Sequence, residues 1–241
     1  MESVLRDLDR EQSKMQTDVA NFYRHYEKLA GFVRQHLEQS TIEWARLIAS
    51  HPRSLLLVME TTRIVDEDGY ATHRSSSEPI RFTTLALTSG EMWDQLLRPS
   101  HTRQVTGVEY HGLTIANLDD KLTMSEAWPN IMEQLEDRHL IIFGADYVRQ
   151  AVQSVYQTNV LNNAFCLHNK AKEFYGQFYD LSLEKIFAYQ GIDRKREQLR
   201  DSRDRILMLA QVVNNFAAGM PKQSQEDEAS DGLGDLEGHV F

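Results

Sequence analysis

The first fifty residues contain no proline, a single glycine, and a pattern that repeats every seven residues. Steps of four and three alternate through Leu8, Gln12, Met15, Val19, Phe22, Tyr26, Leu29 and Val33. This spacing keeps one seam of an α-helix facing a partner helix. The sequence therefore predicts a long, coiled-coil-like helix over residues 1–39. Its seam either pairs with a second copy of the chain as a homodimer or packs along its own globular domain.

A capping box is expected where this helix meets the next segment. In Ser40-Thr41-Ile42-Glu43, a hydroxyl and a glutamate three residues later can bond the free N–H groups at the start of a new helix. We expect the long helix to end there and a short one to run to Ser50. His51-Pro52 then closes a helical N-terminal segment over residues 1–53.

From Ser54 onward, short apolar runs alternate with turn residues. The runs predict buried strands at residues 55–59, 80–87, 93–97 and 140–143. Amphipathic spacing predicts helices near 124–136 and at 147–156, 182–190 and 199–218. Strands first, followed by strand–helix alternation, predict an α/β domain with a mixed sheet over residues 54–219.

The net charge at first argues against a nucleic-acid partner. The chain has 26 Lys and Arg against 36 Asp and Glu, a net charge of −10, whereas phosphate binding usually leaves a basic footprint. However, the last twenty residues hold six acidic residues and one lysine, so they carry half of the net negative charge of the chain. We expect residues 220–241 to form an acidic, disordered tail, so the charge does not exclude nucleic acid.

Composition excludes several other classes of protein. The single cysteine, Cys166, rules out a disulfide framework and a cysteine-rich zinc site. No apolar run approaches the roughly 20 residues of a membrane span, and the first ten residues are too charged for a signal peptide. A cytoplasmic protein without a membrane partner is expected. Glycine-rich phosphate loops are absent from the sequence, so nucleotide triphosphate hydrolysis is not supported.

The run Leu55–Thr62 (LLLVMETT) resembles the first motif of the DnaQ-like (DEDDh) 3′–5′ exonucleases, where a buried strand ends in Asp-x-Glu-Thr-Thr/Ser-Gly. Later segments follow in the order of that family. They are Glu78–Leu87 with Leu96–Pro99, the YHGLT run at 110–114, LIIFGADYVRQAV at 140–152, and REQLRDS at 196–202. The resemblance covers about residues 54–217. It implies an RNase H-like fold, a mixed sheet flanked by helices.

The resemblance also shows where this chain departs from the family. The reaction uses two divalent metals held by clustered carboxylates, and a histidine as general base. Position by position, this chain keeps Glu60 and Asp201. It has Val58 and Val148 in place of two aspartates and Arg196 in place of the histidine. Valine cannot bind a metal, and arginine stays protonated at neutral pH and cannot act as a base.

These losses imply a pseudo-exonuclease that serves as a nucleic-acid or protein binding module with no cofactor. The alternative is a divergent 3′–5′ exonuclease that uses Mg²⁺ or Mn²⁺, with relocated ligands at Asp146 or Asp204. The candidate metal ligands are then Glu60, Asp201 and Asp146.

The nucleic-acid partner implied by the resemblance is a single-stranded 3′ end, of either DNA or RNA. Its candidate contacts are Thr61, Thr62 and Arg196. The guanidinium of Arg196 either pairs with Asp201 or Glu60, filling the metal site with a fixed positive charge, or holds a phosphate.

Overall fold

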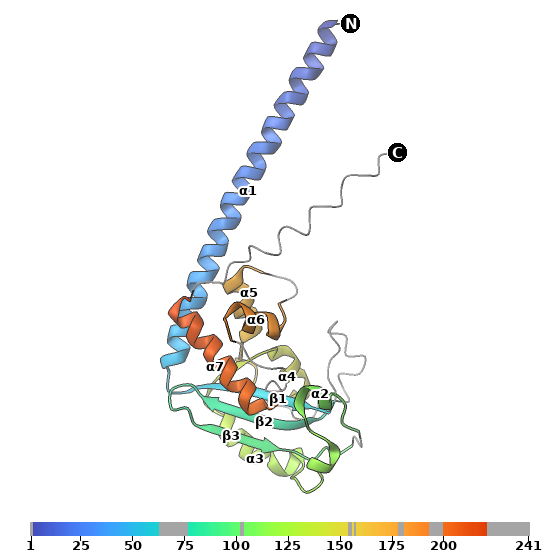
Figure 1. The fold of residues 1–241 in the computed structure, drawn as a ribbon, viewed down its shortest axis with the longest axis vertical. Coiled ribbons are helices and arrows are strands. Elements are labelled where there is room, and N and C mark those ends of the chain that lie inside the picture. Colours follow the sequence, from blue (N-terminus) through green and yellow to red (C-terminus); the bar gives the residue numbers. More distant parts are fainter. Residues whose placement is uncertain are drawn as a thin grey trace.

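A five-stranded mixed sheet forms the centre of the fold (Figure 1). The computed structural model describes residues 2–62, 77–101, 104–153, 156, 158–177, 181–192 and 200–220. The strand order is β3-β2-β1-β4-β5. Strands β1, β2 and β3 form an antiparallel meander, whereas β4 and β5 run parallel to β1. The strands are β1 (Ser54–Thr61), β2 (Pro79–Ala86), β3 (Met92–Leu96), β4 (His139–Ile142) and β5 (Phe165–Cys166).

The central strand β1 is apolar on both faces because both faces of the sheet are covered. Leu56 and Val58 point into one core cluster, and Leu55 and Leu57 into the other. This is why its sequence reads as a continuous apolar run instead of alternating with polar residues. The mixed sheet flanked by helices, in this strand order, is the RNase H-like fold class that the resemblance implies.

Helices cover the two faces in separate groups. On the face of Leu55 and Leu57 lie α3 (Met124–Leu135) and α4 (Ala145–Gln153). The other face is covered by α5 (Leu167–Tyr175), α6 (Leu183–Tyr189), α7 (Ser202–Ala218) and the end of α1 (Glu2–Ser50). Between β3 and α3 run the short α2 (Val108–His111) and the 3₁₀ helix η2 (Ile115–Asn117).

Most of the predicted elements are confirmed, with ends shifted by a few residues. The four predicted strands are β1 to β4, and the predicted helices at 124–136, 147–156, 182–190 and 199–218 correspond to α3, α4, α6 and α7. Helix α7 begins at Ser202 instead of residue 199, because Asp201 caps its N-terminus. The acidic tail predicted for 220–241 lies, apart from Met220, outside the described residues.

The predicted break of the long helix at Ser40 is wrong. Helix α1 is continuous for 49 residues, roughly 70 Å at 1.5 Å per residue. Glu43 accepts a hydrogen bond from Gln39 Nε2 at 3.0 Å, one turn earlier, and so acts within an unbroken helix. Thr41 is fully buried, and its hydroxyl donates to Glu173 Oε2 at 3.4 Å. Tertiary packing thus overrides a local capping signal.

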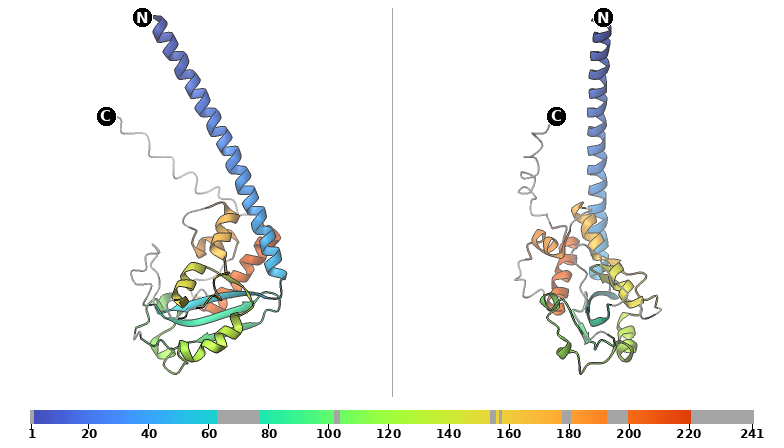
Figure 2. Two further views of the ribbon diagram at one scale, coloured as in Figure 1. Left: turned by 180° about the vertical axis from the view of Figure 1, so that it is seen from behind. Right: turned by 90° about the vertical axis from the view of Figure 1, so that its right-hand side faces the viewer.

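Only the C-terminal part of α1 packs against the body of the protein. Ala45 and Ile48 belong to the core beside α5 and α7, and Arg46 Nε donates to the Ala217 carbonyl at 2.9 Å. The rest of the helix projects away from the body in each view (Figure 2). The alternative in which the seam packs along its own domain is therefore wrong for residues 15–33, whose apolar side chains are exposed. The division of the chain at residues 53 and 219 stays a prediction.

Within the described part of the chain, no helix is both long enough and apolar enough to cross a bilayer.

Candidate functional site

The site lies where the end of β1 meets the N-terminus of α7. Glu60 is the next-to-last residue of β1, and its neighbour across the antiparallel pair is Arg81 of β2. Asp201 caps α7 by accepting a hydrogen bond from the Arg203 N–H at 3.0 Å. The next residue, Ser202, donates its hydroxyl to Glu60 Oε1 at 2.7 Å. The fold therefore brings Glu60 and Asp201 to one place, as the resemblance implies.

An arginine from α7 forms an ion pair with the carboxylate of Glu60. Arg205 Nη2 lies 2.8 Å from Glu60 Oε1, the same oxygen that accepts the Ser202 hydroxyl. The side chains of Glu60 and Arg205 are 9% and 17% exposed. Because charged hydrogen bonds are strong where water is largely excluded, this ion pair fixes the carboxylate in place.

A second arginine, Arg81, joins two further carboxylates. Its Nε and Nη2 donate to the two oxygens of Asp94 at 2.7 and 2.8 Å, a bidentate pair. Its Nη2 also lies 3.0 Å from Asp201 Oδ1. Thr83 donates its hydroxyl to Asp94 at 2.7 Å, and Arg203 reaches Asp201 Oδ2 at 3.3 Å. The cluster therefore ties β2, β3 and α7 together with alternating charges.

The surroundings of Arg81 and Asp201 favour their charged forms. Burial alone would lower the pKa of Arg81, but the hydrogen bonds and charges of Asp94 and Asp201 outweigh it and raise that pKa. Burial alone would raise the pKa of Asp201. The N–H donors of Arg203 and the charges of Arg81 and Arg203 outweigh it, so the pKa lies below the usual 3.8. The ion pair is therefore intact at neutral pH.

This lowered pKa predicts an acid-sensitive contribution to stability. Above pH 3.8 Asp201 is ionised in both the folded and the unfolded chain, and its ion pairs are fully present. Below that pH the unfolded chain takes up the proton first, so stability falls as the pH drops through the folded pKa. We expect Asp201→Asn, which can still cap α7, to melt below wild type at pH 6 and almost with it at pH 2. Because the side chain is 38% exposed, the gap at pH 6 should be about 1 kcal/mol or less. Thermal melts across this range measure it, and an equal gap at both pH values would contradict the assignment.

The two valines that replace the family aspartates lie in separate parts of the core. Val58 is buried in the cluster under α7, and Val148, on α4, is buried in the cluster on the opposite face. Asp146, the candidate for a relocated ligand, lies in the first turn of α4. Its side chain is 77% exposed and pairs with Arg149 at 2.7 Å. Asp204 is half-buried in the first turn of α7.

The donor set does not fit the pair of divalent metals that the family uses. Among the residues that the structure describes, no three His, Cys, Asp or Glu side chains are grouped so that they could hold a metal ion. Glu60 and Asp201 are engaged by the guanidinium groups of Arg205 and Arg81. The positive charges paired with these two carboxylates in the structure therefore belong to Arg205 and Arg81. Arg196 itself lies outside the described residues.

Thr61 and Thr62, the candidate nucleic-acid contacts, are buried and bonded within the protein. The Thr61 hydroxyl shares a hydrogen bond with the Tyr147 hydroxyl at 2.5 Å. The Thr62 hydroxyl accepts from the Glu78 N–H at 3.1 Å, and its carbonyl accepts from the Thr106 N–H at 2.9 Å. Contact between either threonine and nucleic acid stays a prediction.

A histidine anchors the loop beside them. His111 is 3% exposed. Its Nδ1 accepts from the Leu113 N–H at 3.0 Å, so Nε2 carries the hydrogen that is donated to the Thr106 carbonyl at 3.0 Å. Through Thr106 and Thr62, this loop is held at the end of β1, next to Glu60. The ring is used for loop structure and not for chemistry at the cluster.

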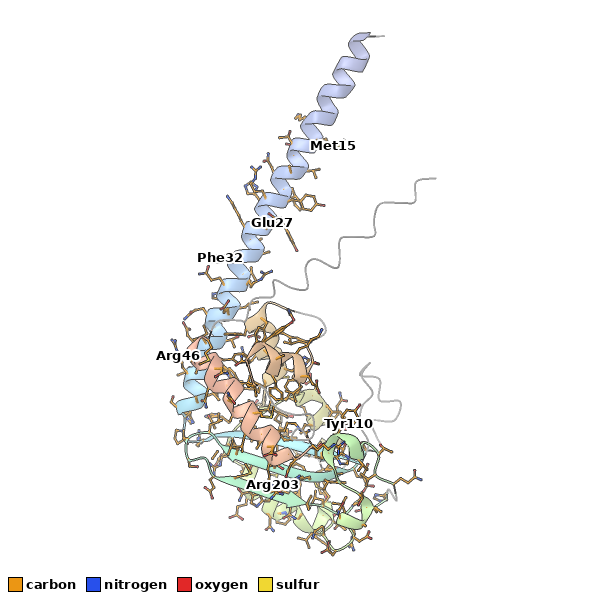
Figure 3. The ribbon with its side chains drawn as sticks, in the orientation of Figure 1. Met15, Glu27, Phe32, Arg46, Tyr110 and Arg203 are labelled. Atoms are coloured by element: carbon orange, nitrogen blue, oxygen red, sulfur yellow. The ribbon has the colours of Figure 1, made fainter. Side chains whose placement is uncertain are left out.

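Sequence reasoning missed the most important partners of the site, which are Arg81, Asp94 and Arg205. A charged residue within each of two paired strands was the available signal for Arg81 and Asp94. For Arg205 the signal was its spacing, because it lies three residues after Ser202 and therefore on the same side of α7. Figure 3 shows Arg203 at this end of α7, across the β1–β2 sheet.

Comparison with known proteins gives structural similarity only. No protein-family model and no curated protein matches the sequence. The structure is similar to a chain in the structure of the yeast NOT1 MIF4G domain co-crystallised with CAF1, with 11% identity, a TM-score of 0.48, and coverage of 75% of this chain and 83% of that one. It is also similar to a full-length 3′-exonuclease, with 13% identity, a TM-score of 0.49, and coverage of 70% of this chain and 62% of that one. A third similar structure is the RNase domain of yeast Pop2, with 13% identity, a TM-score of 0.47, and coverage of 74% of this chain and 82% of that one. The structural neighbours thus include nuclease domains, while the fold class itself follows from the strand order and directions of the sheet.

Proposed function

We propose that this protein is a catalytically degenerate exonuclease-fold protein that binds a partner without cleaving it. The observation that supports this most directly is the pairing of Glu60 with Arg205 and of Asp201 with Arg81. Both carboxylates retained from the family are neutralised by guanidinium groups that belong to the protein. A site of this kind resembles the exonuclease centre in the position of its two carboxylates. Its arginines already balance their charge, so it does not require metal cations.

A divalent ion would have to compete with arginines for both carboxylates. To bind Glu60 it would have to displace Arg205, and to bind Asp201 it would have to displace Arg81 and Arg203. Arginine cannot lose its proton at neutral pH, so each displaced guanidinium would stay close by and repel the ion. Two-metal cleavage needs both ions about 4 Å apart. We propose that the protein works without Mg²⁺ or Mn²⁺ and without another cofactor.

The proposed partner is a single-stranded 3′ end or a protein surface. The nucleic-acid partner is inferred from the resemblance of residues 54–217 to exonucleases, which hold a single-stranded 3′ end before they cut it. Within the site itself, however, the three arginines 81, 203 and 205 are balanced by Glu60, Asp94 and Asp201. Binding of phosphates would therefore draw on cations outside this cluster. The other predicted partner is a second copy of this chain.

A cleavage assay on the full chain tests the absence of activity. With 3′-labelled single-stranded DNA and RNA and with Mg²⁺ or Mn²⁺, we expect no shortened product above a no-protein control. The alternative, an exonuclease with Asp146 or Asp204 as relocated ligand, predicts metal-dependent shortening that Glu60→Gln abolishes. That result would overturn the proposal, whereas activity unaffected by Glu60→Gln would mark a contaminating nuclease.

Binding without cutting is measured with the same labelled strands by fluorescence anisotropy over a range of salt concentrations. Nucleic-acid binding predicts an affinity that falls steeply and linearly on a log–log plot as phosphate contacts are screened. If the anisotropy of neither DNA nor RNA changes when the protein is added, binding of nucleic acid is rejected. A protein is then the remaining proposed partner.

A further inference from the structure

The projecting part of α1 carries a continuous row of exposed apolar side chains. Their spacing is that of the heptad, and each is 45–67% exposed. We call this row the α1 seam: Met15, Val19, Phe22, Tyr26, Leu29 and Val33. Tyr23 and Phe32 flank it and are equally exposed. Figure 3 shows Met15 far out on the helix and Phe32 closer to the body. Scattered surface apolar residues are ordinary, but a long contiguous row marks an interaction surface.

The body of the protein lies on a different side of the helix from the seam. Thr41, Ala45 and Ile48 point into the core, and Arg34, seven residues before Thr41, packs beside Gly176. With Val33 at heptad position a, these four residues occupy positions b and f, which face away from a partner helix. Along residues 15–33 a second helix can therefore lie on the seam without meeting the body that belongs to the first. Closer to the body, Trp44 at position e packs against Phe165.

One more apolar residue lies in line with the seam, beyond the point where the helix enters the body. The a and d positions after Val33 are polar at His36, Ser40 and Glu43. Leu47, fourteen residues after Val33 and so at the same heptad position, is 70% exposed although its neighbours Ala45 and Ile48 are buried. Leu47 therefore lies on the side of the helix that does not pack against the described part of the body.

The exposed apolar area is enough for a stable dimer. Four aromatic side chains, of about 200 Å² each and roughly two-thirds exposed, contribute on the order of 500 Å² per helix. The aliphatic members of the seam raise this to about 800 Å², which is what each partner buries in a standard protein interface.

We propose that α1 pairs with α1 of a second copy of this chain as a parallel, two-stranded coiled coil. Valine at two of the a positions (19 and 33) and leucine at a d position (29) are the residue types of two-stranded coiled coils, whereas Phe22 and Tyr26 widen the middle of the seam. In a parallel pair, Phe32 at position g lies beside Leu37 of the partner subunit at position e, so the flanking apolar side chain is covered as well.

The position of Leu47 favours the parallel direction. In a parallel pair Leu47 meets Leu47 of the partner subunit, and every exposed seam residue is covered by its own counterpart. An antiparallel pair that covered both Met15 and Leu47 would set these two residues opposite each other. It would also carry residues 2–11 of each helix beyond Ser50 of the other, alongside its body. The parallel pair instead places both bodies at one end, on outward faces.

Mass in solution tests the pairing. For the full chain of 27.9 kDa, light scattering at micromolar concentrations should give twice that mass. Val19→Glu/Leu29→Glu places charges in the seam and should give a monomer, with a dissociation constant raised at least 100-fold. Ala20→Glu/Gln35→Glu adds the same charge on the outer face and should stay dimeric. A monomeric wild type, a larger assembly, or dissociation of both variants alike would overturn the proposal.

The direction is tested by cross-linking. Under mild oxidation, Leu29→Cys should form a disulfide-linked dimer, because d positions meet in a parallel pair. Ala20→Cys, on the outer face, and the wild type, whose only thiol is the half-buried Cys166, should not. A dimer in which Leu29→Cys fails to cross-link would reject the parallel arrangement.

Discussion

Replacing Arg81 with leucine is expected to lower the free energy of unfolding by about 2–3 kcal/mol, because it leaves the partly exposed carboxylates of Asp94 and Asp201 without their guanidinium partner. Arg81 is 4% exposed. It donates two hydrogen bonds to Asp94 and lies 3.0 Å from Asp201. Without it, Asp94 keeps the Thr83 hydroxyl but loses its bidentate partner. Urea unfolding followed by circular dichroism measures the loss.

Two comparisons separate the ion pair from the loss of a side chain. Arg98→Leu, at an exposed arginine just beyond β3, should change stability by less than about 0.5 kcal/mol. Arg81→Leu/Asp94→Leu removes both charges and should recover more than half of the loss, since an apolar pair can replace a buried ion pair at little cost. If the double variant is no more stable than Arg81→Leu, the charge pairing is not the source of the effect.

The strands of the sheet were predictable because each carries a signal of its own. The run Leu55–Met59 is apolar throughout, as a strand covered on both faces must be. Strand β5 was missed because Phe165–Cys166 is only two residues long and its pairing depends on β4. The break predicted at Ser40 failed for the converse reason. Its motif is local, whereas Thr41, Ala45 and Ile48 are fixed by packing against α5 and α7.

For the site, the resemblance predicted which acidic side chains meet, but not what neutralises them. The order of motifs places Glu60 at the end of β1 and Asp201 at the start of α7, and the structure brings these together through Ser202. The partner of Asp201 depends on strand register, because Arg81 lies opposite Glu60 and Asp94 opposite Thr83. The partner of Glu60 depends on how α7 lies across the sheet, which brings the guanidinium of Arg205 to the Glu60 carboxylate.

The pair of Glu60 and Arg205 gives the second large effect. Arg205→Leu should destabilise the protein by about 3 kcal/mol, because Glu60 would then hold a charge that is 9% exposed and paired only with the Ser202 hydroxyl. Lys185→Leu, on the surface helix α6, is the control and should change stability by less than about 0.5 kcal/mol. Urea unfolding again provides the measurement.

Glu60→Gln distinguishes a structural carboxylate from one kept for metal. In a metal-free cluster of carboxylates, like charges repel one another, so removing one stabilises the fold. Here Glu60 faces Arg205, and its loss should cost about 1–3 kcal/mol, because hydrogen bonds to charged groups are worth that much. Glu60→Gln/Arg205→Leu should be more stable than Arg205→Leu alone, since no buried charge is left unpaired. A stabilising effect of Glu60→Gln, together with a melting temperature of the wild type that Mn²⁺ raises, would show that this carboxylate serves a metal and not an arginine.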